Sequence, residues 1–253
     1  MFEQTISFTA LSPSQEFQSG DSIGAAVVAA AHEPLLPDEI LVISHKSVSK
    51  AEGQTRLLGD VVPGDEAMRI ATAQGRDPRH VQVILDETEQ ILREEHGVLI
   101  CVTKHGFVCA NAGVDASNTV GSDEVVLLPL DPDASAVRIR NEIRDASGTA
   151  PAVVVTDSFG RAWRVAQVDV AIGCAGVSPI EDWRGKLDRA GRALAATEIA
   201  IADAVAAAAD LARSKDSGQP FVRVSGLGRY VTEADGPGAQ VLLRQAHQDL
   251  FRR

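Results

Sequence analysis

The chain has 253 residues, 45% of them apolar, and a formal net charge of −11. This length allows one large domain or two small ones, and the apolar fraction is high enough for a substantial core. The acidic balance argues against nucleic acid and anionic membranes as partners, because binding to either requires a basic face.

The sequence also indicates a compartment and a role for the cysteines. Residues 1–10 lack a secretory pattern, and no apolar run approaches the roughly 20 residues of a membrane span, so we expect a cytoplasmic protein. Cys101, Cys109 and Cys174 are odd in number and lack a Cys-x-x-Cys spacing, which argues against a disulfide framework and a zinc ribbon. We interpret them as small buried hydrophobic residues.

The first half of the chain contains predicted strands on both sides of a predicted helix. The apolar run 39–43 predicts a buried strand that leads into a segment rich in serine and lysine. Apolar residues at helical spacing predict an amphipathic helix over 78–97, with a proline near its start and Gly97 as its stop. Residues 98–102 and 107–110 flank a tight turn and predict a β-hairpin.

The second half begins with a predicted strand at 125–130. Asp131 and Pro132 then cap and begin a helix that runs to about Arg144, and Gly148 ends it.

Two further strands are predicted at 153–155 and 163–170, and the stretch from about Arg189 to Arg213 is dense in alanine. We expect that stretch to form a long helix that packs in the interior or between subunits. Residues 221–224 predict a last strand before a glycine-rich loop. Because strands and helices alternate irregularly, we predict an α+β fold with mixed sheets, hairpins and packed helices, in a single domain over 1–253.

Three apolar stretches each run into a polar cluster that contains an aspartate, at 112–118, 153–158 and 165–169. Two carboxylates ~4 Å apart repel by about 4 kcal/mol near a protein surface, so converging aspartates need a cation or a shared proton. Hard oxygen ligands favour magnesium or manganese. Any single one of these aspartates could instead form an Asx turn or cap a helix.

An anionic substrate would have to be held by local positive charge in so acidic a chain. The available side chains are Lys46, Lys50, Arg161 and Arg164. The sequence lacks both the P-loop pattern and a Gly-x-Gly-x-x-Gly after a strand, so any nucleotide must be bound in another way.

Four runs, at 47–53, 107–118, 128–133 and 156–164, resemble the coenzyme F420-0:L-glutamate ligase family, the gamma-glutamyl ligases of deazaflavin cofactor synthesis. The resemblance covers essentially the whole chain, in the stand-alone form without the C-terminal nitroreductase-like domain of some actinobacterial relatives. It implies an F420 gamma-glutamyl ligase-like fold and an intertwined homodimer.

The resemblance further implies an enzyme that uses GTP with Mg²⁺ or Mn²⁺, and K⁺ as a further ion. Such a ligase joins L-glutamate through its alpha-amine to a carboxylate of coenzyme F420-0, and then adds glutamate by gamma linkage. The carboxylate is a poor acyl donor, so the family is expected to form an acyl phosphate first.

By motif match, the resemblance assigns Asp115, Asp157 and Lys50 to catalysis. It makes Asp115, Asp157 and Ser158 metal ligands, and it implies a set of nucleotide contacts: Glu16, Phe17, His45, Lys50, Asn118, Arg161 and Arg164. Gln167 and Asp169 lie in a block that the family shares, where structural and catalytic roles are both open.

Two other classes of function stay open beside the ligase. A metal-dependent nucleotide phosphohydrolase would use the same aspartates to activate water. A non-catalytic module that binds F420 or a nucleotide would have kept the fold and lost turnover. Asp115, Asn118 and Asp157 are all present, which argues against the module but does not separate the two enzymes.

Overall fold

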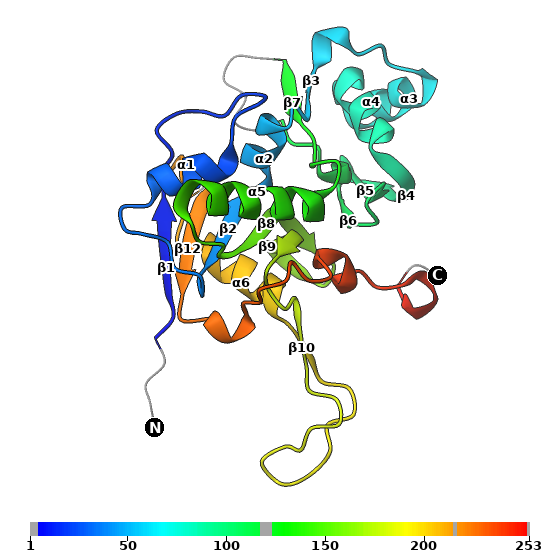
Figure 1. Ribbon diagram of the computed structural model, residues 1–253. Helices are drawn as coiled ribbons and strands as arrows, with labels where there is room; N and C mark the ends of the chain where they lie inside the picture. Colours follow the sequence, from blue (N-terminus) through cyan, green and yellow to red (C-terminus); the bar gives the residue numbers. More distant parts are fainter. Residues whose placement is uncertain (1–4, 117–122, 215–216, 252–253) are drawn as a thin grey trace.

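A five-stranded mixed sheet forms the centre of the computed structural model, which describes residues 5–116, 123–214 and 217–251 (Figure 1). The strands lie in the order β1–β12–β2–β8–β9, in which β2 and β8 are parallel and all other neighbours antiparallel. Their bounds are Ser7–Leu11 for β1, Phe221–Ser225 for β12, Ile40–Ser44 for β2, Ala152–Arg161 for β8 and Arg164–Ala175 for β9. The mixed sheet confirms the predicted α+β class.

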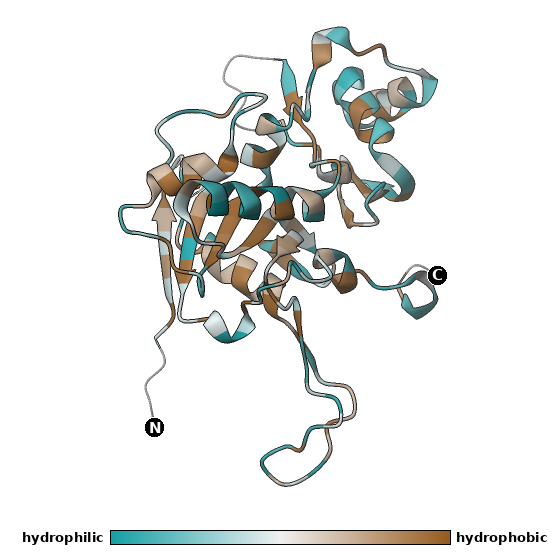
Figure 2. Ribbon diagram, viewed as in Figure 1, coloured by the Kyte–Doolittle hydropathy of each residue, from teal (hydrophilic) through white to brown (hydrophobic). Residues whose placement is uncertain are grey.

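Helices cover both faces of this sheet. They are α1 (Ile23–Ala30) and α5 (Pro132–Ser147) on one face and α6 (Ile201–Asp210) on the other. Along β2, Leu41 and Ile43 pack toward α1 and α5, whereas Ile40 and Val42 pack toward α6. Because successive strand residues point to opposite faces, an uninterrupted apolar run is what a strand buried on both sides requires. In Figure 2 the central strands are accordingly brown, while α5 is largely teal.

A smaller group of elements lies beside the sheet and has its own apolar core. It contains α3 (Asp65–Gln74), α4 (Pro78–Asp86), β4 (Thr88–Glu95), β5 (Val98–Thr103) and β6 (Val108–Ala110), with the short turn η2 (Asn111–Gly113). The antiparallel ribbon of β3 (Thr55–Leu57) and β7 (Glu124–Val126) adjoins it. The predicted hairpin of β5 and β6 is confirmed, whereas the predicted strand 125–130 is only three residues long as β7.

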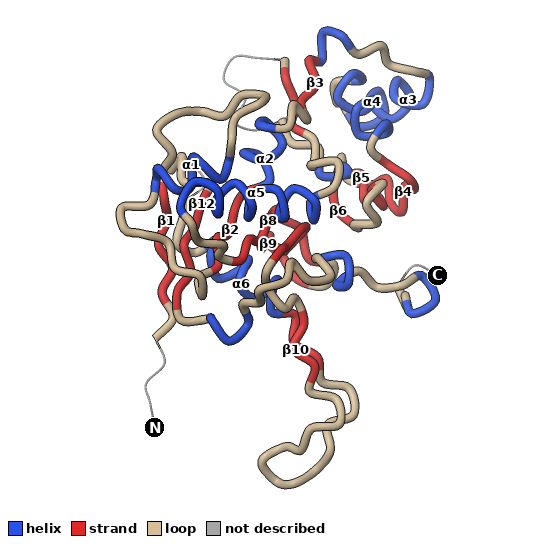
Figure 3. Tube along the Cα trace, viewed as in Figure 1, coloured by secondary structure: helices blue, strands red, loops and turns tan. Residues whose placement is uncertain are grey.

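An arm projects from the main body between β10 (Ile180–Asp182) and β11 (Glu198–Ala200), and Figure 3 shows it mainly as loop. The remaining short elements are α2 (His45–Ala51) and the 3-10 turns Leu58–Asp60, Gly228–Tyr230, Ala239–Leu242 and Ala246–Gln248. In the part of the chain that the structure describes, no helix has the length and apolar character needed to cross a bilayer.

The predicted helix over 78–97 is wrong beyond Asp86. α4 ends there, and β4 then pairs antiparallel with β5. His96 and Gly97 both have positive φ, 53° and 75°, so they form the tight turn of a β-hairpin and not a helix stop. The apolar residues after Asp86 continue the helical spacing, but cross-strand pairing with β5 makes this segment a strand.

The predicted helix from Arg189 to Arg213 is also wrong over most of its length, because only Ile201–Asp210 is helical. Residues 183–197 belong to the projecting arm, where alanine finds no apolar surface to pack against. High helix propensity does not by itself stabilise a helix in water, and α6 forms where Ile201 and Val205 are buried against the sheet. By contrast, the predicted cap of α5 is confirmed, since the Asp131 side chain accepts a hydrogen bond from the Ala134 amide at 3.0 Å.

Glu39, immediately before β2, makes the fold sensitive to acid. Burial alone would raise the pKa of its carboxyl, but hydrogen bonds from Arg223 (2.7 Å), Ser225 (2.6 Å) and the Leu36 amide (2.9 Å) outweigh burial and hold the pKa below 4.5. A carboxyl whose pKa is lower in the folded state than in the unfolded state contributes its full stabilisation at pH values above its unfolded-state pKa. This contribution is lost as the pH falls through the folded-state pKa. Glu39→Gln is therefore expected to flatten the decline of the unfolding free energy below about pH 4.5.

The measurement is urea unfolding at a series of pH values, with Glu89→Gln on an exposed position of β4 as the control. If the unfolding free energy falls equally steeply with decreasing pH in Glu39→Gln, in Glu89→Gln and in the native chain, the role assigned to Glu39 is contradicted.

Candidate functional site

A cleft of about 830 Å³ opens where the parallel strands β2 and β8 reach their carboxyl ends. Its walls come from α2, the η2 turn, the outer halves of β8 and β9, the loop 13–17, and the segments 213–214 and 218–220. Ligand sites in sheets with parallel strands commonly lie at such carboxyl ends. The structure brings Asp115, Asp157 and Asp169, one from each predicted polar cluster, to this one cleft.

Two consecutive residues at the start of α2 contact two aspartates from different parts of the chain. The Nε2 atom of His45 lies 3.2 Å from Oδ1 of Asp157, and Nζ of Lys46 lies 2.6 Å from Oδ2 of Asp115. β2 passes directly into α2 at Ser44, so no loop separates the strand from these two side chains. The carboxylates therefore each have a basic partner and do not face one another without compensation.

Asp115 is positioned by an unusual turn. Asn111, Ala112 and Gly113 have φ values of 52°, 51° and 74° in succession, in the left-handed region that favours glycine. After the turn, the backbone of Asp115 exchanges both hydrogen bonds with Val126, at 2.9 and 2.8 Å. Non-glycine residues held in this conformation are concentrated at functional sites. In the sequence, Asn111 and Gly113 are the residue types that tolerate the conformation, whereas Ala112 gives no sign of it.

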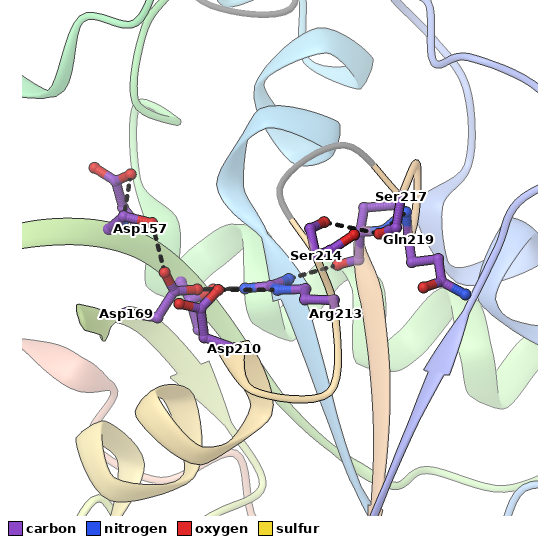
Figure 4. A network of polar contacts seen from close by, with 10 residues as sticks. Asp157, Asp169, Asp210, Arg213, Ser214, Ser217 and Gln219 are labelled. Atoms are coloured by element: carbon purple, nitrogen blue, oxygen red, sulfur yellow. Dashed lines mark hydrogen bonds and ion pairs between the residues drawn. The ribbon is translucent and has the colours of Figure 1, made fainter. Parts of the chain in front are cut away.

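Asp157 on β8 and Asp169 on β9 belong to one polar network (Figure 4), and Ser158 connects them. The hydroxyl of Ser158 donates to Asp169 Oδ1 at 2.6 Å, and the amide of Ser158 donates to Asp157 Oδ1 at 2.7 Å. A register shift between Val155 and Thr156 precedes this segment. Such bulges re-aim the side chains that follow, and they often occur beside active sites.

Arg213 completes this network from the loop after α6. Its guanidinium pairs with Asp169, donates to the Thr156 hydroxyl at 3.1 Å and reaches the Pro220 carbonyl at 3.1 Å (Figure 4). The side chains of Asp169 and Arg213 are only 3% and 9% exposed, so each neutralises the other in a buried environment. Sequence reasoning missed Arg213, because no local motif marks a partner 44 residues away.

The predicted nucleotide contacts are distributed unevenly. Lys50 faces the cleft and pairs with Glu16 at 3.0 Å, and Phe17 anchors the same loop by packing on Phe221, with ring centroids 5.8 Å apart. The cleft lining extends along the hairpin only to Gly160 and Gln167, and it therefore stops short of two predicted contacts, Arg161 and Arg164. A third, Asn118, lies outside the described residues.

The predicted metal ligands fit a hard divalent cation by their chemistry. Asp115, Asp157 and Ser158 offer carboxylate and hydroxyl oxygens on one cleft, which is the donor set that Mg²⁺ and Mn²⁺ prefer. Among the described residues, no group of three or more His, Cys, Asp or Glu side chains could hold a metal ion. A cation here would thus depend on further oxygens from phosphate or water, as Mg²⁺ sites commonly do.

Cys109 lines the cleft, yet its environment suppresses thiolate chemistry. Burial raises the pKa of its thiol well above the ordinary value, and the negative charge of Asp157 acts in the same direction. Burial likewise raises the pKa of Cys174 to about 12. Cys109→Ala is expected to change kcat by no more than about twofold, and the native protein is expected to resist alkylation by iodoacetamide. Rapid labelling of Cys109, with matching loss of activity, would contradict this prediction.

Comparison with known proteins identifies the family. The model of the family F420-0:Gamma-glutamyl ligase matches residues 13–226. The chain belongs to this family. It is therefore a ligase that forms an amide bond, which agrees with the sequence-based resemblance.

Individual members of the family are similar over nearly their full length. The coenzyme F420:L-glutamate ligase of Methanothermobacter thermautotrophicus is 42% identical over 238 residues, which span 92% of this chain and 94% of that protein. The protein of the same name from Haloarcula marismortui is 40% identical, over 94% of this chain and 92% of its own length. The one from Methanocaldococcus jannaschii is 38% identical, over 93% of each chain.

Proposed function

We propose that this protein joins L-glutamate, through its alpha-amine, to a carboxylate of coenzyme F420-0 at the cost of GTP, and then extends the product by gamma linkage. One observation carries the proposal. This chain belongs to the ligase family, and its cleft is lined by Lys50 together with the two aspartates Asp115 and Asp157. The substrates follow from the printed names of relatives 38–42% identical to this chain.

The chemistry requires two displacements. A carboxylate oxygen of the acceptor attacks the γ-phosphorus of GTP, the bond to GDP breaks, and an acyl phosphate forms. The glutamate amine then attacks the acyl carbon, inorganic phosphate leaves with the bonding pair, and the amine proton passes to a base or to water. Phosphoryl transfer of this kind depends mainly on positioning and on neutralising charge at the phosphate oxygens.

The residues of the cleft suit these requirements. Lys50 is assigned to the phosphates of GTP, and its present partner Glu16 is 86% exposed and easily displaced. Asp115, Asp157 and Ser158 would hold Mg²⁺ or Mn²⁺, which when bound neutralises negative charge on the phosphates. His45, only 2% exposed, fixes the Asp157 carboxylate, and Lys46 does the same for Asp115. K⁺ and the homodimer remain predictions of the family resemblance, and light scattering would test the dimer.

Mass spectrometry tests the proposal directly. The purified chain is incubated with F420-0, L-glutamate, GTP and MgCl₂, and each component is omitted in turn. A product heavier by one or two glutamyl units, dependent on all four components, is the expected result. GDP release without any glutamylated product would favour a nucleotide phosphohydrolase instead, and binding without turnover of either kind would favour a module without activity.

A further inference from the structure

The tip of the β8–β9 hairpin carries an aromatic surface that the fold leaves uncovered. The side chain of Trp163 is 81% exposed and that of Val165 is 90% exposed. Phe251 packs against Trp163 with ring centroids 6.1 Å apart and an interplanar angle of 53°, and it is itself 64% exposed. Large aromatic groups gathered in water on a loop tip mark a binding surface more often than isolated apolar residues do.

This surface continues the cleft. The cleft lining follows the hairpin from Asp157 through Phe159 to Gly160, and Gln167 lines it from the other strand. β8 continues four residues beyond Asp157 to Arg161, which corresponds to about 13 Å along the strand, and Trp163 lies in the turn that follows. Phe159 also packs edge-on against Phe107, with centroids 6.0 Å apart, so an aromatic wall lies between the two ends.

Positive charge lies between the cleft and Trp163. Arg161 and Arg164 stand opposite each other in the strand register, and residues 159–168 contain no acidic side chain. Arg161 donates to the Val165 carbonyl at 2.7 Å, and both side chains are exposed. Among the described residues, no carboxylate lies within ion-pair distance of either arginine. In a chain with a net charge of −11, such a segment suits an anionic ligand.

We propose that this hairpin tip binds the deazaflavin end of the acceptor, with the planar ring stacked on Trp163 and an anionic group of the acceptor held by Arg161 and Arg164. The inference rests on the proposed function, and it names the site of one substrate. The acceptor carries a deazaflavin ring and the carboxylate that reacts, so it has to extend from the site that binds its ring to the reacting groups of the cleft. A ring at Trp163 would leave the carboxylate near Asp157, while GTP occupies the side of the cleft at Lys50.

This proposal assigns the two arginines to the acceptor, whereas the family resemblance assigned them to the nucleotide. A nucleotide phosphate at Lys50 and Asp157 would be about 13 Å along the strand from Arg161, which is four residues away. An acceptor lying along the hairpin would pass directly between the arginines. The C-terminal segment, red in Figure 1, supplies the second aromatic ring through Phe251.

Direct binding to Trp163 provides the first test, and it needs no turnover. The chain has two tryptophans, so Trp183→Phe leaves Trp163 as the only one. Titration of this variant with F420-0 is expected to quench its fluorescence to saturation, whereas GTP is expected to leave it unchanged. The reverse variant, Trp163→Phe, retains Trp183 on the arm and is expected to show no saturable quenching.

Steady-state kinetics provides the second test. Trp163→Ala is expected to raise KM for F420-0 about tenfold, as for loss of one stacking partner, with KM for GTP and glutamate unchanged. Trp163→Phe should recover most of the affinity. The double variant Arg161→Gln/Arg164→Gln should raise the same KM and weaken its dependence on salt. Leu187→Ala and Arg189→Gln/Arg192→Gln, at exposed positions on the arm, are the matched controls.

The outcomes separate this proposal from the ligase function. A normal glutamylated product, with no quenching of Trp163 and no change in KM for F420-0, would overturn the site and leave the ligase intact. Saturable quenching by F420-0 in a chain that forms no product would support the site and overturn the ligase. A higher KM for GTP in the arginine variant would assign these side chains to the nucleotide. A lower particle mass of Trp163→Ala in light scattering would identify the surface as a subunit contact. The higher KM for GTP and the lower particle mass would each overturn the proposal.

Discussion

Asp157→Asn is expected to lower kcat for glutamylation of F420-0 by about a thousandfold while leaving the fold intact. Asparagine has the same shape and can still accept the hydrogen bond from the Ser158 amide, now 2.7 Å from Oδ1. It removes the negative charge that faces His45 and that the proposed function assigns to a divalent ion. The measurement is the rate of product formation by mass spectrometry, together with the unfolding free energy in urea.

The matched control for Asp157 is Asp145→Asn, a substitution of the same kind at an exposed position of α5. Both variants are expected to unfold within about 1 kcal/mol of the native chain, since asparagine keeps the size and shape of aspartate at both positions. An Asp157→Asn protein that is folded and fully active would remove this carboxylate from the catalytic set. If Asp157→Asn is both inactive and unfolded, the same two measurements are made on Asp157→Ser, whose side chain is smaller and also neutral.

Arg213→Ala is expected to destabilise the fold by about 3–5 kcal/mol, the largest effect on stability that we predict. The substitution leaves the carboxylate of Asp169, only 3% exposed, without its positive partner. It also removes the hydrogen bonds that join the loop after α6 to Thr156 and to Pro220. The measurement is the midpoint and slope of urea unfolding at pH 7.

An exposed ion pair supplies the control for Arg213. Arg184 and Asp182 lie 2.6 Å apart on the arm with side chains 52% and 48% exposed, so Arg184→Ala is expected to cost no more than about 1 kcal/mol. The double variant Asp169→Asn/Arg213→Met should recover much of the lost stability, because it removes both buried charges together. If Arg213→Ala and Arg184→Ala lower the unfolding free energy by similar amounts, the negative charge of Asp169 is neutralised by a group other than Arg213.

The fold was predictable where one local pattern has a single structural solution. The apolar run before Ser44 became β2, and Asp131 with Pro132 began α5, because burial on two faces and a helix cap are properties of a few neighbouring residues. The segments 88–95 and 189–200 had patterns compatible with a helix. Their structure was decided by tertiary context that the helical pattern does not contain, namely pairing with β5 in the first case and the lack of a packing surface in the second.

The candidate site shows the same division. The clusters around Asp115, Asp157 and Asp169 were recognisable from polar residues that follow apolar runs, and the structure brings them to one cleft. The partners of these aspartates were not recognisable. Lys46 reaches Asp115 across 69 positions of sequence and Arg213 reaches Asp169 across 44, so only the folded sheet reveals the pairs.

The direct junction of β2 with α2 restricts how the length of this chain can vary in evolution. A helix turns by about 100° per residue, so one residue inserted or deleted at Ser44 would rotate His45 and Lys46 away from Asp157 and Asp115 together. The strand cannot absorb the change by slipping, because both of its faces are buried. The arm between β10 and β11 carries no such restriction, and family members are expected to differ in length there and to agree at the junction.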